Sequence, residues 1–297
     1  MRVLVIGADN FVGRPLLEAL TRSDWAKPIV ASETSGFDQA VEMADSIVNC
    51  TMGRPQAVVD AARKLFAVVQ RLSRPPPVVH VSSMTVYGSV SGPVDENAPL
   101  LADPGAYAQA QLAADQLAGQ YPQAIRLRTG VEYGPGCQQW SGLIADLLAR
   151  GRLGDLGAGG DGTCNLLFID DLVAAIAESL RRPQLQGKAF NLAMAAAPTW
   201  NGYFIAFAKA LGAVPVRRIS RRRLSTEVKY LAPPLKISQM LLGRLLPPPI
   251  TPSLVAACRQ EIRLDSSAAE VHLGLQWTGL GVGLERAAAW WKTERRY

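Results

Sequence analysis

The chain has 297 residues, 48% of them hydrophobic, with four cysteines and a formal net charge of +6. This length and apolar content are enough to bury a substantial core in one large or two unequal domains. The start of the chain lacks the order of basic, apolar and small residues of a signal peptide, and no apolar run approaches the roughly 20 residues that span a bilayer. We therefore expect a cytoplasmic protein with reduced, mostly buried thiols.

The first residues predict a nucleotide-binding turn. An aliphatic strand at 2–6 is followed by a turn between Gly7 and Gly13 and then by a helical pattern. In such a turn the glycines let the backbone approach a pyrophosphate, and the helix start presents free amides to it. Asn10 stands where a middle glycine would be, so we expect it to tolerate positive φ while its side chain crowds the phosphates. Contacts with a cofactor are predicted at Gly7, Asn10, Phe11, Val12 and Gly13.

Strand-like and helical segments alternate as far as about residue 195. The alternation predicts an α/β fold, a Rossmann-like doubly wound parallel sheet covered on both faces by helices. Strands are predicted at 2–6, 28–32, 46–49, 78–82, 124–127 and 166–169, and helices at 13–21, 55–72, 105–119 and 171–180.

The pattern changes after Leu192. Pro233-Pro234 and Pro247-Pro248-Pro249 punctuate apolar helical segments, and because adjacent prolines cannot continue a helix these segments must be short and angled. Residues 235–246 combine many leucines with Lys236, Gln239 and Arg244. We expect that stretch to pack inside a lobe, which is the simpler interpretation; the alternative is that it lies on a membrane surface.

Much of the excess positive charge comes from one cluster of arginines, which is either a solvated surface face or a grip for an acidic substrate. Its members are Arg217, Arg218, Arg221, Arg222 and Arg223. The cluster has no interleaved aromatic residues, so nucleic-acid binding is not expected. A metal site is not expected either, because His80 lies in a predicted buried strand and His272 is distant in sequence.

Five motifs in a fixed order resemble the extended short-chain dehydrogenases/reductases. The motifs are Val5–Gly13, Val81–Gly88, Tyr107–Gln111, Arg128–Gly136 and Phe168–Leu172. That group includes NAD-dependent epimerases and dehydratases as well as hydroxysteroid-dehydrogenase-like and flavonol-reductase-like enzymes, and the resemblance spans nearly the whole chain. It implies a dinucleotide-binding domain formed by residues 1–136 and 165–195, and a smaller, mainly helical substrate lobe formed by 137–164 and 196–297. It also implies a homodimer through the helices near Pro55 and Gly105.

The resemblance assigns roles in hydride transfer at a carbinol or ketone, where an acid/base must reach the reacting oxygen. Ser83 resembles the serine that orients the substrate oxygen, and Tyr107 resembles the acid/base. In the family, a lysine one helical turn after the tyrosine lowers its pKa from about 10 and holds the nicotinamide ribose. This chain has Gln111 there, which can bond the ribose but cannot carry the charge. The result is a slow or alkaline-shifted enzyme, another proton path, or a binding protein that has kept the pocket.

The cofactor implied by the resemblance is NAD, with NADP as the alternative. Glu33, about 20 residues beyond the glycine turn, would accept the adenosine ribose hydroxyls, and no arginine is nearby for a 2′-phosphate. Only about a dozen residues separate Glu33 from the next strand, where the family usually inserts another strand-helix unit, so the sheet is expected to be one strand short at an edge. Further cofactor contacts are expected at Cys50, Thr51, Met52, Ser82, Gln111, Thr129 and Val131.

Two positions bear on the substrate, which we expect to be a small molecule. Nucleotide-sugar members usually have an asparagine just before a Val-Tyr-Gly-Pro element and often a phosphate-binding arginine near position 165; this chain has Val131 and Asn165. Both departures favour a less charged substrate, whereas the arginine cluster argues the other way. The predicted function is NAD(P)-dependent oxidoreduction of a secondary alcohol or ketone of a small or medium-sized metabolite. The alternatives are a nucleotide-sugar epimerase or dehydratase and a non-catalytic NAD(P)-binding sensor or scaffold.

Overall fold

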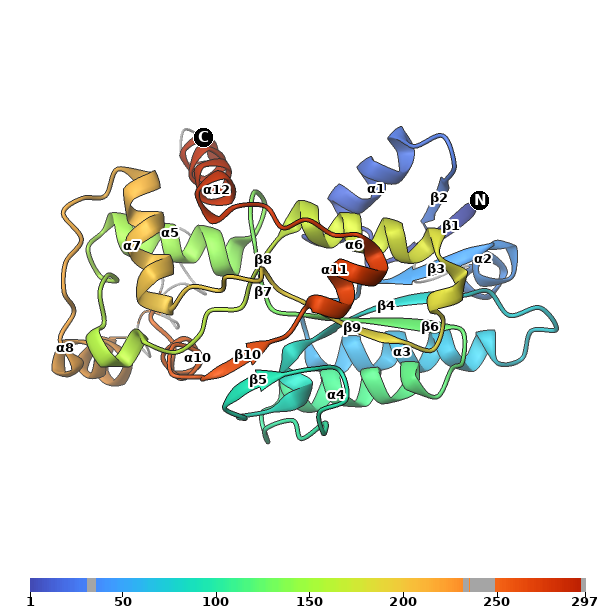
Figure 1. The fold of residues 1–297 in the computed structure, drawn as a ribbon, viewed down its shortest axis with the longest axis horizontal. Coiled ribbons are helices and arrows are strands. Elements are labelled where there is room, and N and C mark those ends of the chain that lie inside the picture. The colour runs from blue at the N-terminus through green and yellow to red at the C-terminus, as the bar shows by residue number, and fades with distance from the viewer. Residues whose placement is uncertain (31–35, 232–234, 236–248, 295–297) are drawn as a thin grey trace.

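A six-stranded parallel sheet forms the centre of the protein in a computed structural model, which describes residues 1–30, 36–231, 235 and 249–294. The strand order is β2-β1-β3-β4-β6-β9. These strands are β1 (Arg2–Ile6), β2 (Lys27–Val30), β3 (Ser46–Asn49), β4 (Val78–Ser83), β6 (Ala124–Thr129) and β9 (Ala189–Leu192). Figure 1 shows helices on both sides of the sheet, which confirms the predicted doubly wound α/β fold.

Alternate residues of the strands face two separate cores, because side chains along a strand point to opposite faces. Leu4 and Ile47 belong to the core under α2 (Phe37–Met43), α3 (Pro55–Val69) and α4 (Ala106–Gly119). Val3, Val5 and Val48 belong to the core under α1 (Gly13–Arg22) and α6 (Ile169–Arg181). Burial on both faces explains why the central strands are continuous aliphatic runs.

The membership of the main sheet differs from the sequence prediction at two strands, and the short strands outside it, β7 (Val131–Tyr133) among them, were not predicted. The segment at 166–169 does not join the main sheet: β8 (Leu166–Phe168) pairs with β7 in a separate two-stranded sheet, and α6 already begins at Ile169. The sixth strand of the main sheet is β9, which the sequence pattern did not predict. Between β2 and β3 the described residues contain α2 and no further strand, as the short spacing predicted.

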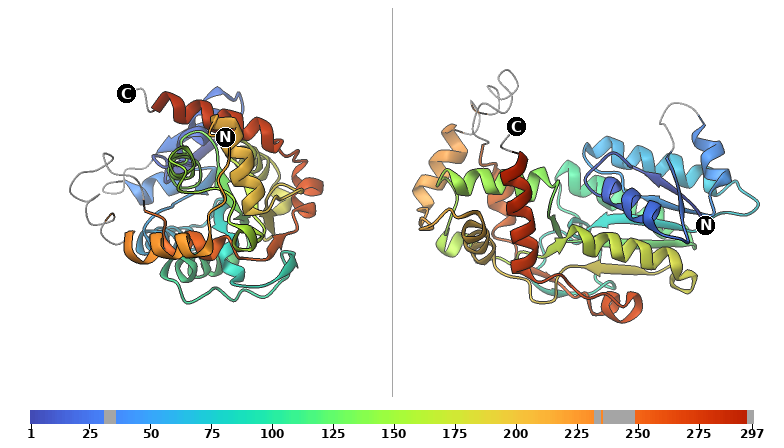
Figure 2. Two further views of the ribbon diagram at one scale, coloured as in Figure 1. Left: turned by 90° about the vertical axis from the view of Figure 1, so that its left-hand side faces the viewer. Right: turned by 90° about the horizontal axis from the view of Figure 1, so that it is seen from above.

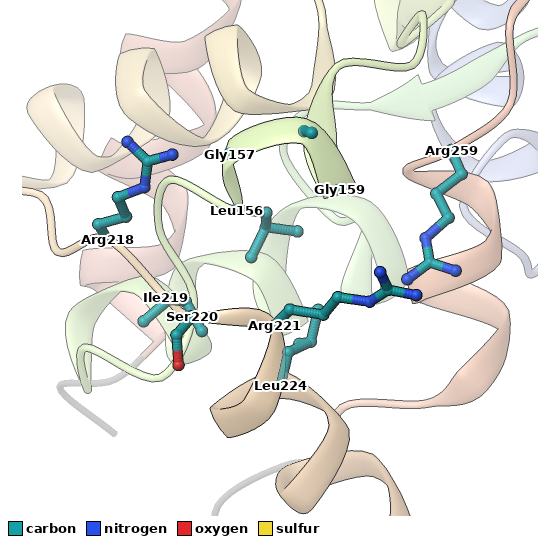
Figure 3. A pocket seen from close by; sticks show the side chains of 10 residues that line it. Leu156, Gly157, Gly159, Arg218, Ile219, Ser220, Arg221, Leu224 and Arg259 are labelled. Carbon is teal, nitrogen blue, oxygen red and sulfur yellow. The ribbon is translucent and has the colours of Figure 1, made fainter.

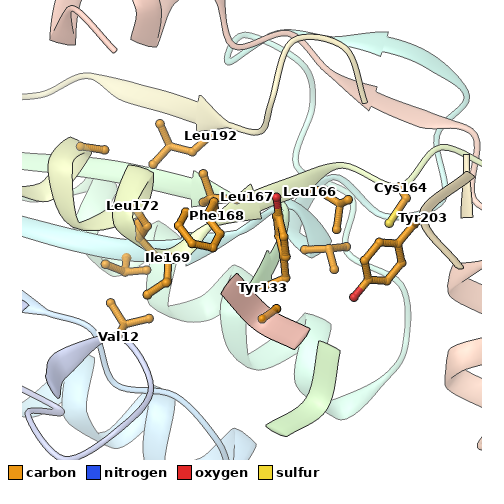
Figure 4. Close-up of a cluster of buried hydrophobic side chains, with 14 of the residues drawn as sticks. Val12, Tyr133, Cys164, Leu166, Leu167, Phe168, Ile169, Leu172, Leu192 and Tyr203 are labelled. Atoms are coloured by element: carbon orange, nitrogen blue, oxygen red, sulfur yellow. The ribbon is translucent and has the colours of Figure 1, made fainter. Parts of the chain in front are cut away.

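Five helices that follow residue 142 gather at one end of the sheet. They are α5 (Leu143–Ala149), α7 (Trp200–Leu211), α8 (Arg221–Thr226), α10 (Pro252–Ala257) and α12 (Leu280–Glu294). Figures 1 and 2 agree in placing this group beyond the strand ends, with α12 packed against α7. Figure 4 shows how the core continues into it, from Val12 past Phe168 and Tyr133 to Tyr203 of α7.

Not all of the C-terminal region belongs to this helical group. The strand β10 (Ile262–Leu264) pairs with β5 (Gly92–Val94), and α11 (Ser267–Leu273) contacts β9 and α6 beside the main sheet. Glu33, Pro233, Pro234 and the segment 236–248 lie outside the described residues. No helix in the described part is long and apolar enough to cross a membrane.

A buried ion pair fixes α4 against the sheet. The guanidinium of Arg128 on β6 donates through Nε and Nη2 to the two carboxylate oxygens of Asp115, at 3.2 and 3.1 Å, and both side chains are almost fully buried. A third donor, Nη1, bonds the Tyr87 hydroxyl at 2.8 Å. Burial by itself would raise the pKa of Asp115, but the hydrogen bonds and charge of Arg128 outweigh it and leave that pKa below its ordinary value.

Asp115→Asn is expected to lower the free energy of unfolding by about 3–5 kcal/mol, because it leaves the Arg128 charge buried without its counter-charge. The lowered pKa of Asp115 means that this stabilisation is present at neutral pH and is lost as the pH falls through that value. The deficit measured by urea unfolding should therefore shrink at acid pH. Asp60→Asn, on the exposed face of α3, is the control and should change the stability by about 0.5 kcal/mol or less; an equal effect of both variants would contradict the assignment.

Candidate cofactor and substrate site

The predicted glycine turn joins β1 to α1 and depends on both of its glycines. Gly7 has a φ of +85°, a left-handed conformation that side chains rarely adopt. A Cβ at Gly13 would stand 2.1 Å from the Gly7 carbonyl oxygen, so only glycine fits. Gly136, from the motif after β7, lies beside the Phe11 ring, where a Cβ would be 3.5 Å away. The turn and the loop after β7 therefore share one end of the sheet.

Asn10 does not have the positive φ expected from the sequence, because no described residue other than glycine has one. Its side chain instead closes the turn from within. Asn10 Oδ1 accepts hydrogen bonds from the amides of Val12 and Gly13, each at 2.9 Å, and Nδ2 donates to the Cys50 carbonyl at 2.6 Å. Two amides that were expected to be free for a phosphate are thus satisfied by the chain itself.

Ser83, Tyr107 and Gln111 come together at the carboxyl end of β4. Ser83 ends that strand, and its Oγ accepts from the Thr85 amide at 3.3 Å and the Thr85 hydroxyl at 3.1 Å. Tyr107 and Gln111 lie one helical turn apart at the start of α4, and Gln111 Nε2 donates to the Tyr107 hydroxyl at 3.1 Å. Gln111 is only 4% exposed, and its Oε1 atom is buried without a hydrogen-bond partner among the described residues.

The phenol of Tyr107 is held in its protonated form. The residue as a whole is 39% exposed, but its hydroxyl accepts a hydrogen bond from the buried Gln111 amide, so burial acts on the ionising end. Burial, and secondly the negative charge of Glu132, raise the pKa of Tyr107 to about 12; hydrogen bonds from Gln111 and Ser83 oppose this. The phenol therefore carries its proton at neutral pH.

Glu132 is a site residue that the sequence reasoning missed. It lies in the middle of β7, is 8% exposed, and burial raises the pKa of its carboxyl to about 7, against a hydrogen bond to the Thr129 side chain that lowers it. The signal was present in the sequence, because an acidic residue stands inside a short apolar strand, within a motif already recognised. Burial of an acidic side chain costs free energy unless its charge is compensated or neutralised, so such a position points to a special role.

The other predicted cofactor residues line the ends of neighbouring strands. Cys50, Thr51 and Met52 follow β3, and the amide and hydroxyl of Thr51 both donate to Asn49 Oδ1. Ser82 is buried in β4, and its carbonyl accepts from the Thr129 hydroxyl of β6 at 2.9 Å. Val131 follows, with its amide bonded to the Asn165 carbonyl. Because β1, β3, β4 and β6 are adjacent, these residues share the edge of the sheet at which such folds bind nucleotides.

A basic pocket of about 420 Å³ lies in the helical group. Figure 3 shows Arg221 of α8 and Arg259, just after α10, with their guanidinium groups pointing toward each other across it, while Arg218 lies beside Gly157. No ion pair joins these three arginines to another described residue. Within the described ranges, no three histidine, cysteine or acidic residues are close enough to hold a metal ion.

Comparison with solved structures shows the same fold over the whole chain. UDP-glucuronic acid 4-epimerase from Bacillus cereus, in complex with UDP-glucuronic acid and NAD, is 15% identical with a TM-score of 0.74, covering 99% of this chain and 100% of that one. Human epimerase family protein SDR39U1 with NADPH is 19% identical, with a TM-score of 0.71 and coverage of 97% and 99%. RMD from Pseudomonas aeruginosa complexed with NADPH is 15% identical, with a TM-score of 0.71 and coverage of 98% and 99%.

Comparison of the sequence with curated proteins found no match. Residues 57–193 match the model of the NAD dependent epimerase/dehydratase family. This segment runs from α3 to β9 and contains Ser83, Tyr107, Gln111 and Glu132. Residues 57–193 thus match the NAD dependent epimerase/dehydratase family, and the whole chain has the fold of the solved epimerases.

Proposed function

We propose that the protein is an NAD(P)-dependent oxidoreductase that acts on a secondary alcohol or ketone, with Ser83 and Tyr107 at the reacting oxygen. The observation that carries the proposal is the meeting of Ser83, Tyr107 and the buried Gln111 beside the glycine turn. Structural neighbours contain NAD or NADPH, which supports the same class of cofactor here. Bound cofactor would supply or accept the hydride.

The residues at the sheet edge fit a dinucleotide. The turn at Gly7 and Gly13 leaves no space for side chains, so that the backbone can approach a pyrophosphate. The unpartnered Oε1 of Gln111 is a buried acceptor facing no donor, and a ribose hydroxyl would satisfy it. We propose that the pyrophosphate binds at Gly7, Phe11, Val12 and Gly13. Residues 50–52 and 131 form further walls of the cofactor site in this proposal. The dinucleotide domain (1–136 with 165–195) and the lobe (137–164 with 196–297) remain part of this proposal, as does a homodimer.

Asn10 competes with the cofactor for two backbone amides in this arrangement. Asn10→Gly should free the Val12 and Gly13 amides and tighten NADH binding by about tenfold, corresponding to ~1.4 kcal/mol. The same change removes the hydrogen bonds that Asn10 Oδ1 accepts at the start of α1 and should lower the stability of the free protein by about 1 kcal/mol. Calorimetric titration with NADH and with NADPH, together with thermal unfolding, measures both effects.

The matched control for this substitution is Asn97→Gly, which removes an exposed turn asparagine bonded only to Asp95. Its cofactor affinity should remain that of the wild type. Weaker NADH binding by Asn10→Gly would show that the asparagine helps to hold the cofactor rather than competing with it. Absence of binding of either cofactor at millimolar concentration would remove the proposed function.

In carbonyl reduction, Ser83 would orient the oxygen and the Tyr107 hydroxyl would donate its proton. Tyr107→Phe removes that proton and should lower kcat by about 10²-fold or more, measured as NADH or NADPH oxidation on a panel of aliphatic and cyclic ketones. Tyr230→Phe, an exposed tyrosine in the helical group, is the control and should leave turnover unchanged. Full activity of Tyr107→Phe on a ketone that is turned over would refute the assigned role. Cofactor binding without turnover of any ketone would favour the sensor or scaffold alternative.

The basic pocket favours a second candidate, a nucleotide-sugar epimerase or dehydratase, because three arginines without acidic partners are suited to a phosphate. Structural neighbours contain UDP-glucuronic acid or UDP-glucose. If this candidate is right, UDP-glucose should bind to the wild type, and the double variant Arg221→Gln, Arg259→Gln should bind at least about tenfold more weakly. Arg222→Gln, outside the pocket, is the control. An epimerase or dehydratase would turn over its nucleotide sugar without net formation of NADH, whereas a dehydrogenase would form NADH.

A further inference from the structure

The positive charge of the protein is concentrated in one part of the chain. Nine basic residues but only one acidic residue lie between positions 217 and 260, which gives this part a formal net charge of +8 against +6 for the whole chain. Six of the nine are exposed residues of α8, of the π-helix η5 (Glu227–Leu231) that continues it, and of the segment just before α8. They are Arg217, Arg218, Arg221, Arg222, Arg223 and Lys229. Figure 1 places α8 at the end of the helical group remote from the main sheet, and the view from above in Figure 2 agrees.

The charge of these six cations is not neutralised by the protein itself. The one acidic residue of this part, Glu227, is buried, and its carboxylate accepts from Arg152 Nη2 and Nε at 2.6 and 3.2 Å. Asp155, whose backbone pairs with that of Arg218, accepts from the Gly157 amide at 2.7 Å. No ion pair joins any of the six cations to another residue in the described ranges. The outer surface of α8 and η5 is therefore cationic and lacks a counter-charge.

The cations border two hollows whose walls are aliphatic. The basic pocket of Figure 3 and a second hollow of about 360 Å³ share Arg221, Leu224 and Arg259, so the two lie side by side between α8 and α10. No acidic residue of the described chain lines either hollow. The aliphatic walls are formed by Leu156, Ile219, Leu224, Val228, Pro252 and Val255. Cations beside an aliphatic surface match the boundary between the anionic headgroups and the acyl chains of a lipid bilayer.

Two further features favour a lipid surface over another polyanion. Tyr230 is 62% exposed, and the Lys229 ammonium lies 5.3 Å from the centre of its ring. Tyrosine beside cations is common at the interface between membrane and water, because the ring is apolar and its hydroxyl is polar. The chain also leaves the described residues at Leu231, the end of η5, and returns before α10. The sequence from 232 to 248 contains five leucines, and Lys236 and Arg244 are its only charged residues.

We propose that the outer surface of α8 and η5, together with the two hollows beside it, docks on a membrane surface that contains anionic phospholipid. This inference goes beyond the proposed function and needs neither cofactor nor substrate. The exposed cations contact the headgroup phosphates, while Tyr230 and the aliphatic walls contact the region where the acyl chains begin. Attraction of this kind extends over about one Debye length, roughly 10 Å at 0.1 M salt, so salt weakens it.

Flotation of the full chain with lipid vesicles tests the docking. The wild type should bind vesicles of phosphatidylcholine that contain about one-third phosphatidylglycerol at about 0.1 M NaCl, and should bind pure phosphatidylcholine vesicles at least about tenfold more weakly. Raising the NaCl concentration to about 0.5 M should release the protein, because the charges are then screened. Absence of binding to the anionic vesicles would overturn the proposal, and so would equal binding to both kinds of vesicle.

Reversal of three cations that lie outside the pocket of Figure 3 locates the docking surface. The triple variant Arg222→Glu, Arg223→Glu, Lys229→Glu should bind the anionic vesicles about 100-fold more weakly, since each cation near an anionic surface strengthens binding about fivefold. The matched control changes the net charge equally at exposed residues that precede β4 and β9, and should bind within about threefold of the wild type. Its substitutions are Arg71→Glu, Arg74→Glu and Lys188→Glu. An equal loss in both triple variants would show an effect of net charge alone and refute the proposed surface.

Two further measurements complete the test. Both triple variants should keep the Tm and the NADH affinity of the wild type, because all six substituted side chains are exposed and lie outside the proposed cofactor site. Binding to a DNA duplex of random sequence, at the same salt concentration, should be much weaker than binding to the anionic vesicles. DNA binding as tight as vesicle binding, and lost in the variant at positions 222, 223 and 229, would show a nucleic-acid surface and overturn the proposal. A wild type that docks on vesicles but binds no NADH or NADPH would remove the proposed function and leave the docking surface standing.

Discussion

The buried ion pair between Arg128 and Asp115 is the constraint on which the geometry of the site depends. Asp115 lies on α4 one turn beyond Gln111 and two turns beyond Tyr107, and the pair ties that face of the helix to β6. The same guanidinium also reaches Tyr87, whose hydroxyl bonds the Asn191 side chain of β9. One charged group thus sets the positions of a helix, two strands and the turn after β4. The Tyr107 hydroxyl is thereby held at the end of β4, close to Ser83.

Charge is distributed unevenly between the two halves of the protein. The proposed reaction site contains a neutral phenol, a neutral amide and a carboxyl that burial holds near the point of ionisation. The helical group contains a pocket lined by three arginines without acidic partners among the described residues. A substrate with an anionic part away from its reacting carbon would suit this separation, since the cations lie away from the tyrosine and do not stabilise its phenolate.

The Asn10 side chain stabilises the glycine turn in the free protein and opposes the binding of a ligand at the same amides. Asn10 satisfies two amides at the start of α1 and a carbonyl at the end of β3, so the turn is complete without a ligand. A turn with glycine at this middle position would leave the two backbone amides free to bond water or a phosphate. The proposed pyrophosphate must therefore displace the asparagine side chain or bind around it.

The sequence by itself determined the fold class and the glycine turn, because these depend on local periodicity and on backbone freedom at two glycines. Helix α4 and the strands β1, β3 and β4 were predicted nearly to their bounds for the same reason. The roles of Ser83 and Tyr107 came from the resemblance to a family and stay a proposal. What only the tertiary structure decided depends on contacts between distant segments. It removed 166–168 from the main sheet, added β9, turned Asn10 inward onto Cys50, and buried the side chain of Glu132. Burial and the pKa shifts that follow from it are properties of the packed molecule, since an acidic residue in a linear sequence shows neither its solvent exposure nor its neighbours.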